Sequence, residues 1–148
     1  MRESYEFLEH LDSLKSRGIV FVPIENAAWI KGRWSKLFAS SLSKEEKQDI
    51  YYDQFRWHIF SFEKVKCLNG EEARRAFDAC QKQKVYQFFQ HSRVGFCIEN
   101  AHLLNAENLD YENEIPWSDT YLFDPEGKWT YVRTHESMCG PYFYKEVS

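Results

Sequence analysis

The chain has 148 residues, of which 43% are hydrophobic and 18% aromatic, and its formal net charge is −4. This share of core-forming side chains excludes intrinsic disorder, and the length suits one domain spanning residues 1–148. No apolar run approaches the roughly 20 residues of a membrane helix, and residues 1–20 lack a secretion-signal pattern. The four cysteines form no CxxC pair. We therefore expect a reduced, cytoplasmic protein without a membrane span.

The first half of the chain is predicted to be mainly helical, with one strand. Leucines recur at helical spacing in the first segment, and a β-branched and aromatic run follows it. Further on, a serine and a glutamate three residues later match a capping box, in which side chains and backbone close the first helical turn. The predicted elements are a helix over 4–17 that Ser4 caps and Gly18 ends, a strand over 19–22 that Pro23 ends, a helix over 26–38 that Asn26 caps, and a helix from Ser43 to about Gln54.

The second half is predicted to consist mainly of strands. Residues 56–62 alternate large and polar side chains, as a half-buried strand does. Proline and glycine stand at turn positions between two β-rich runs near the end of the chain, which predicts a hairpin. The predicted elements are strands over 56–62, 85–90, 96–99, 120–123 and 129–134, and a helix over 71–82 after the Asn69-Gly70 turn. Because helices come first and strands follow, the predicted class is α+β, with N-terminal helices packed on a mainly antiparallel β-sheet.

Acidic residues are concentrated in one segment. Residues 98–127 contain eight acidic side chains and no basic one. Such a run can be a solvated loop, or it can attract a basic partner. It also opposes nucleic-acid binding, so the basic and aromatic segment 31–36 is interpreted as a helix with Trp34 facing inward. We expect a partner-binding surface made of carboxylates and two aromatic side chains, namely Glu107, Asp110, Tyr111, Glu112, Glu114, Trp117 and Asp119.

Two interpretations apply to the histidines near the predicted strands. His58, His135 and Glu136 could form the acid–base site of a small hydrolase or ligand-binding enzyme at the sheet edge. Alternatively, the strand end at His135 clamps the following loop, with its imidazole hydrogen-bonded to a carboxylate or carbonyl, which is the interpretation we prefer. A zinc site of His58, His135 and Cys139 lacks any known ligand spacing. Since no glycine-rich phosphate loop or nucleophile motif occurs either, we expect no metal and no cofactor.

Three segments carry a resemblance to a known family. They are residues 57–62, residues 119–124, and residues 129–143 with the patterns WTYVxTHE and GPYF. Over nearly its whole length the chain resembles a family of small bacterial proteins catalogued as a domain of unknown function. The resemblance implies a Gram-positive origin and, because some members are thought to be encoded after large secreted toxin genes, an immunity-type role. We expect a non-enzymatic protein that neutralises a basic toxin domain through its acidic surface; a regulatory module of unknown target is a third alternative.

Overall fold

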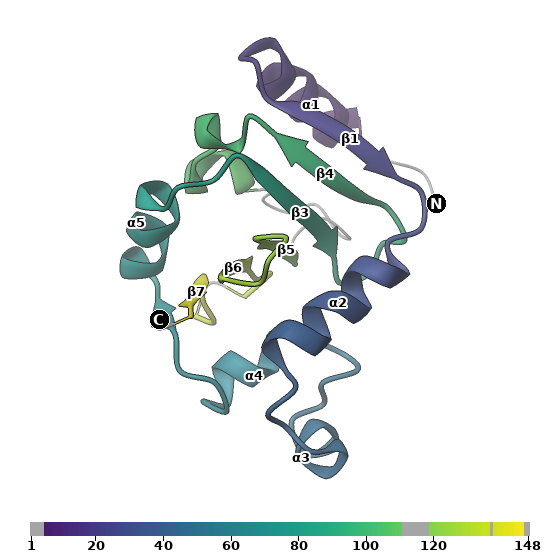
Figure 1. Cartoon of the computed structure of the whole chain (residues 1–148), viewed down its shortest axis with the longest axis vertical. Coiled ribbons are helices and arrows are strands. Elements are labelled where there is room, and N and C mark those ends of the chain that lie inside the picture. Colours follow the sequence, from purple (N-terminus) through teal and green to yellow (C-terminus); the bar gives the residue numbers. More distant parts are fainter. Residues whose placement is uncertain (1–4, 111–118, 137, 147–148) are drawn as a thin grey trace.

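A seven-stranded antiparallel β-sheet forms the middle layer of the structure, a computed structural model that describes residues 5–110, 119–136 and 138–146. The strand order is β1-β4-β3-β5-β6-β7-β2, and each neighbouring pair is antiparallel. Figure 1 shows β1, β4 and β3 along their lengths but β5, β6 and β7 nearly end-on, so the sheet is strongly twisted. The predicted α+β class, with helices packed on an antiparallel sheet, is confirmed.

Helices and strands are mixed along the first two thirds of the chain, and strands dominate its end. The strands are β1 (Val20–Ile24), β2 (Leu68–Asn69), β3 (Lys84–Phe89), β4 (Gly95–Glu99), β5 (Thr120–Phe123), β6 (Trp129–Arg133) and β7 (Tyr142–Lys145). The helices are α1 (Tyr5–Ser16), α2 (Ala28–Phe38), α3 (Lys44–Asp49), α4 (His58–Ser61) and α5 (Glu71–Ala79), with 3-10 turns η1 (Ala101–Leu103) and η2 (Ala106–Leu109). Among the described residues, no helix is long and apolar enough to cross a bilayer.

One face of the sheet is covered by α1, α5 and the two 3-10 turns. Leu11 and Leu14 project from α1 into this core, and Phe77 projects from α5. The Phe77 ring stacks on Tyr131 of β6 with 4.4 Å between ring centroids and 24° between ring planes. Offset stacking of this kind adds to the free energy gained by burying the two rings. The helices on this face are therefore fixed to both halves of the twisted sheet.

The other face is covered by α2 and α4, and Trp34 is its centre. The Trp34 side chain is fully buried, and its ring meets Tyr121 edge-to-face at 5.2 Å. Its indole N–H donates to Thr130 Oγ1 at 2.9 Å, and that hydroxyl donates to the carbonyl of Leu122 at 2.7 Å. The polar atoms of these two buried side chains are therefore hydrogen-bonded, as buried polar groups generally are. The inward orientation predicted for Trp34 is confirmed.

Elements with strong local signals lie where the sequence predicts them. Ser43 accepts a hydrogen bond from the backbone of Glu46, and the Glu46 carboxylate accepts one from the backbone of Ser43, so the capping box is confirmed. The β5–β6 hairpin is also confirmed. Its turn contains Gly127 at φ +82°, and a Cβ there would lie 2.6 Å from a Leu37 methyl carbon. Glycine is therefore needed at this position for both conformation and space.

Other boundaries differ from the predictions. The predicted strand over 56–62 is wrong, because this segment forms α4 and buries two successive residues, Ile59 and Phe60, which a half-buried strand does not do. The helix predicted from Ser43 to about Gln54 ends earlier, because α3 stops at Asp49. The helix α5 ends at Ala79 rather than at residue 82. The first strand continues through Pro23, which an edge strand tolerates because one side of it has no ladder to complete. Ser4 lies outside the described residues.

The two tryptophans of α2 give a matched test of this core. We expect Trp34→Ala to lower the free energy of unfolding by about 3–5 kcal/mol, because it leaves a large cavity and removes a partner of Thr130. Trp29→Ala should cost less than about 1 kcal/mol, because that ring is 53% exposed. Urea denaturation followed by circular dichroism measures both. Equal losses from the two variants would contradict the packing described.

Candidate functional site

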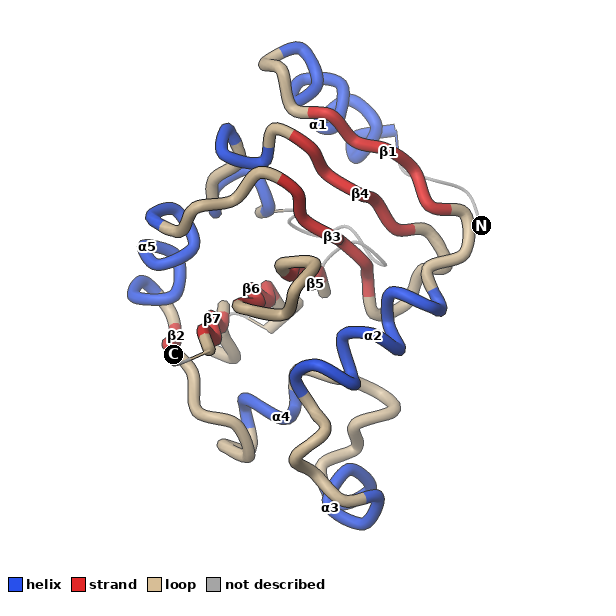
Figure 2. Tube along the Cα trace, in the orientation of Figure 1, coloured by secondary structure: helices blue, strands red, loops and turns tan. Residues whose placement is uncertain are grey.

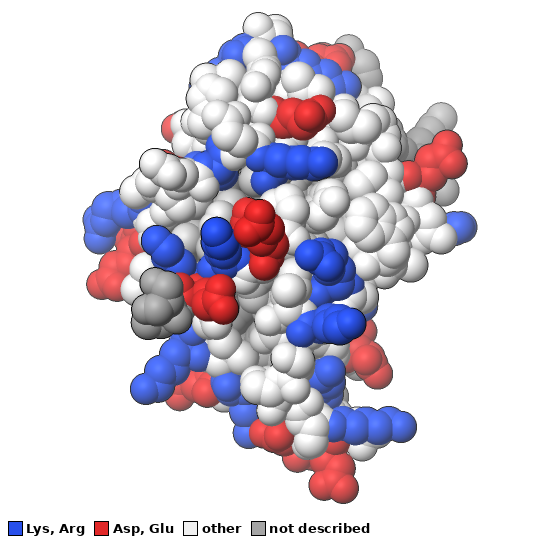
Figure 3. All heavy atoms as spheres, in the orientation of Figure 1, with Lys and Arg blue, Asp and Glu red and all other residues white. Residues whose placement is uncertain are grey.

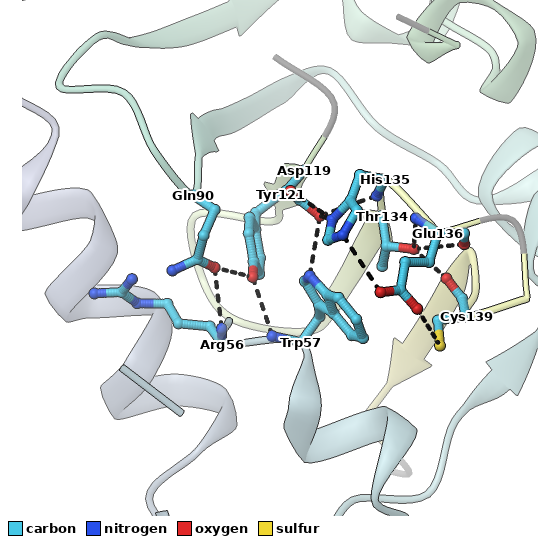
Figure 4. A network of polar contacts seen from close by, with 9 residues as sticks. All are labelled: Arg56, Trp57, Gln90, Asp119, Tyr121, Thr134, His135, Glu136 and Cys139. Carbon is cyan, nitrogen blue, oxygen red and sulfur yellow. Dashed lines mark hydrogen bonds and ion pairs between the residues drawn. The ribbon is translucent and has the colours of Figure 1, made fainter. Parts of the chain in front are cut away.

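Asp119 organises a polar network where three chain segments meet (Figure 4). This residue directly precedes β5 and is 3% exposed. Its Oδ1 accepts hydrogen bonds from the indole N–H of Trp57 and the backbone N–H of His135, both at 3.0 Å. The His135 ring donates through Nδ1, which lies 2.9 and 3.0 Å from the two carboxylate oxygens. A buried carboxylate thus has three donors, which compensate for its loss of water.

A second set of hydrogen bonds continues the network into the core. The Tyr121 hydroxyl accepts from the backbone N–H of Trp57 at 3.0 Å and donates to Gln90 Oε1. The same Gln90 oxygen accepts from the backbone N–H of Arg56 at 3.0 Å. Burial raises the pKa of Tyr121 well above its ordinary value, so the hydroxyl keeps its proton and stays a donor. The segment entering α4 is therefore fixed to β3 and β5.

On its outer side the network reaches the loop between β6 and β7. His135 Nε2 lies 3.4 Å from Glu136 Oε1, and the Cys139 thiol donates to Glu136 Oε2 at 3.6 Å. The Thr134 hydroxyl bonds to the carbonyls of Glu136, at 3.0 Å, and of Cys139. These contacts close the loop on itself ahead of a cis peptide bond between Gly140 and Pro141. His135 is thus bonded to a carboxylate, which is the contact that the clamp interpretation predicts.

A polar cavity of about 230 Å³ lies beside this loop. Arg74 forms a two-pronged pair with Asp110, with nitrogen–oxygen distances of 3.1 and 3.3 Å, and Arg133 Nε lies 3.5 Å from the same carboxylate. The hydrogen bond to Asp110 raises the pKa of Arg74. The cavity is lined by Arg74, Asp110, Arg133, Thr134, Glu136, Cys139, Gly140 and Pro141.

The three residues proposed for an acid–base site do not all meet. His135 and Glu136 are in contact, but the His58 Nδ1 donates instead to the backbone carbonyl of Ile50. The His58 ring packs edge-to-face on Trp57 with 4.6 Å between centroids. His58 therefore helps to fix α4, and its ring bonds to Ile50 rather than to the His135–Glu136 pair.

Nucleophilic chemistry finds little support in this geometry. A catalytic cysteine needs a lowered pKa, but burial is the main cause of a raised pKa at all four thiols, Cys67, Cys80, Cys97 and Cys139. At Cys139 the hydrogen bond to Glu136 raises the pKa of the thiol further. The Thr134 hydroxyl is hydrogen-bonded to two backbone carbonyl groups. In the part of the chain that the structure describes, no three His, Cys, Asp or Glu side chains are placed to hold a metal ion.

The acidic residues proposed for partner binding occupy different environments. Glu107 is exposed on η2, whereas Asp110 is held by two arginines and Asp119 is buried. The three described carboxylates of the proposed binding surface therefore do not form one exposed surface. The other proposed contact residues, Tyr111, Glu112, Glu114 and Trp117, lie outside the described residues.

Sequence reasoning missed the partners that make the network. Trp57 lies 62 residues from Asp119, and Gln90 lies 31 residues from Tyr121, so no local pattern predicts either contact. Asp119 stands in the acidic run and in the 119–124 segment that resembles the family, and neither feature predicts its burial. The WTYVxTHE pattern, which contains His135 and ends at Glu136, is the local signal at the other end of the network.

Comparison with known proteins gives one match. A family model described as a domain of unknown function (DUF4275) matches residues 8–143. The chain belongs to this family. No curated protein and no solved structure matches it significantly. The matched DUF4275 region contains all the described residues of the Asp119 network, from Arg56 to Cys139.

The clamp interpretation predicts coupled losses of stability. We expect Asp119→Asn and His135→Ala each to lower the free energy of unfolding by about 2–4 kcal/mol, because each leaves buried donors or acceptors unpaired. The double variant should lose clearly less than the sum, since both changes break the same interaction. Chemical denaturation of the four proteins measures this, with the exposed Glu107→Gln as control. Additive losses would contradict the clamp.

Lys31 gives a second prediction beside the network. Its ammonium donates to the backbone carbonyls of Ser92 at 2.7 Å and Gln90 at 3.4 Å. Burial, together with the charge of Arg56, lowers the pKa of Lys31 from 10.5 to about 8. Between these two pH values the unfolded chain holds a proton that the folded protein has released, so stability contributed by Lys31 rises with pH.

The free energy of unfolding of the wild type, relative to Lys31→Met, should therefore increase between pH 8 and pH 10.5. Urea denaturation of both proteins at several pH values in this window measures the difference. A carbon-detected NMR titration of the lysine side chains should show one residue titrating well below the others. A difference that is constant or falls with pH would contradict the burial of this ammonium.

Proposed function

We propose that this DUF4275 protein is a non-enzymatic binding protein whose partner is another protein. The observation that carries the proposal is an uncovered apolar area where β1, β4, β3 and the start of α2 meet. We call it the β1–β4 strip, and it comprises Val20, Val22, Trp29, Tyr86 and Cys97. Figure 3 shows a largely uncharged surface over the ends of β1 and β4 and the start of α2, with charged side chains around it.

The register of the strands makes the strip continuous from Val22 inward, whereas Val20 lies opposite Glu99 at its end. Val22 lies opposite Cys97, which in turn lies opposite Tyr86 on β3. The Trp29 ring meets Tyr86 edge-to-face with 5.4 Å between centroids. Facing side chains of neighbouring strands are close enough to form one surface. The strip therefore runs from the sheet edge to the first turn of α2.

Exposure of the strip follows from the path of α2. The buried residues of this helix, among them Ile30 and Trp34, pack toward the centre of the sheet, and its first turn leaves the outer strands open. Val20 and Val22 are 42% and 43% exposed, and Trp29 is 53% exposed. A contiguous apolar area of this kind is typical of a protein-binding surface, in which an exposed tryptophan often supplies much of the binding energy.

The polar network supports a binding role over catalysis. Two side chains that suggested acid–base chemistry are used in fixing the fold, as the bonds of His135 to Asp119 and of His58 to Ile50 illustrate. A binding protein gains from this arrangement, because a rigid surface loses less entropy when a partner docks.

We propose further that the partner is a toxin domain with a basic surface, and that the role is of the immunity type. The support for this is the acidic segment over 98–127, which would attract a basic protein and increase the rate of association. Within it, Glu107 is exposed, whereas Asp110 and Asp119 are engaged inside the fold. The segment contributes to long-range attraction, and the β1–β4 strip contributes the contact.

The test is co-expression with the product of the large gene adjacent to its own. We expect a stable complex and protection of the host cell. Trp29→Ala should weaken the complex about 10- to 100-fold, mainly through faster dissociation, because it removes the anchor of the strip. Added salt should slow association without much change in the dissociation rate. Surface plasmon resonance separates these two rates.

The matched control is Phe62→Ala, which removes an aromatic ring that is 49% exposed and meets His58 edge-to-face at 5.3 Å, away from the strip. This variant should bind as the wild type does. The proposal fails if the two proteins neither associate nor protect, or if Trp29→Ala binds with unchanged affinity.

A further inference from the structure

A second surface feature lies on the opposite edge of the sheet, between α5 and the β2–β7 pair. It is an open cavity of about 520 Å³, lined by Lys66, Cys67, Leu68, Ala76, Ala79, Cys80, Phe143 and Lys145. Figure 2 shows β2 as a short strand at this edge, close to β7 and α5. The volume lies within the range of small-molecule sites in proteins, and it exceeds that of the polar cavity beside the network.

The cavity exists because α5 presents small side chains to the strands at this edge. Ala73 and Phe77 of the helix are buried in the core, but Ala76 and Ala79, on the turn facing the cavity, carry only methyl groups. Phe143 of β7, which is buried, forms part of the wall. Longer aliphatic side chains at the two alanines would occupy the space.

The remaining lining groups are neutral or positive. Burial raises the pKa of Cys67 to about 11 and also raises that of Cys80, so both thiols stay protonated and behave as apolar groups. Lys66 and Lys145 are exposed and belong to the lining, which contains no carboxylate. Within the described residues, neither lysine forms an ion pair. An apolar cavity thus has two available ammonium groups.

Neighbouring features narrow the choice of ligand. The ammonium of a third lysine, Lys82, is engaged within the fold. It donates to the carbonyl of Phe77 at 2.7 Å and lies 4.4 Å from the centroid of the Phe77 ring. A second cavity of about 460 Å³ shares Lys66 and Cys67 with the first, but it contains the carboxylate of Glu63 and is the poorer site for an anion. Negative charge is therefore best accommodated near Lys66 and Lys145.

We propose that the cavity between α5 and the β2–β7 edge binds a small amphipathic carboxylate, such as a medium-chain fatty acid. The hydrocarbon chain lies against Ala76, Ala79 and Phe143, which removes apolar surface from water on both sides. The carboxylate lies between the two lysine ammonium groups, where each charge offsets the other at the solvent boundary. This ligand site lies apart from the β1–β4 strip and does not depend on the proposed partner.

The test uses octanoate as the probe, below its micelle concentration, with octylamine and octanol as probes of the same chain length but different charge. Isothermal titration calorimetry should show saturable binding of octanoate, with octanol at least 10-fold weaker and octylamine without measurable binding. Amide NMR shifts caused by octanoate should cluster at Leu68, Ala76 and Ala79. Equal binding of the three probes, or shifts centred elsewhere, would overturn the proposal.

Two sets of variants separate the head-group and chain contacts. Lys66→Glu combined with Lys145→Glu should weaken octanoate binding at least 10-fold, whereas Lys36→Glu, an exposed change on α2, should leave it unchanged. Ala76→Leu should fill the cavity and block binding while the protein stays folded, which circular dichroism and thermal unfolding check. If Ala76→Leu fails to fold, Ala79→Leu at the more exposed position provides the same test. Wild-type affinity in a folded cavity-filling variant would refute the site.

Discussion

The fold depends on one buried carboxylate and its three donors. Asp119 joins the entry of α4, the start of β5 and the end of β6, through Trp57 and through both the backbone and the ring of His135. A carboxylate without these donors would be too costly to bury, and the donors without it would themselves lose their partner. Segments 62 residues apart along the chain are therefore held in one arrangement. The outer loop, with its closed Thr134 hydrogen bonds, is fixed as a consequence.

Local signals and long-range contacts explain how much the sequence could predict. The capping box at Ser43 and the turn at Gly127 depend on a few neighbouring residues, and both were predicted. The sequence predicts a strand at Trp57, because alternation alone does not reveal that Ile59 and Phe60 are both buried in the core under α2. Likewise, an acidic run does not show that Asp110 will meet two arginines from α5 and β6. Pairings of this kind depend on the assembled sheet.

The two proposed surfaces both arise because the helices pack incompletely on the sheet. Two helices lie on each face of the seven-stranded sheet, α1 and α5 on one face and α2 and α4 on the other. On one face the start of α2 leaves the outer strands open and exposes Trp29. At the other edge α5 reaches the strands but places alanines there, which leaves the cavity. Incomplete cover and small side chains thus produce an apolar strip and a cavity, two surfaces with different chemistry.

The strand order also determines how far apart in sequence the neighbouring strands are. The pairs β3–β4, β5–β6 and β6–β7 join strands that are successive along the chain, whereas β3 pairs with β5, β1 with β4 and β2 with β7 across longer intervening segments. Contacts between successive strands need only short loops to close, so we expect these hairpins to form early in folding and the two edge strands, β1 and β2, to join late. Edges that join last are also those that open most readily in the native state. Because the β1–β4 strip and the cavity between α5 and the β2–β7 pair lie at these two edges, a partner or ligand bound there would slow hydrogen exchange first in the edge strands.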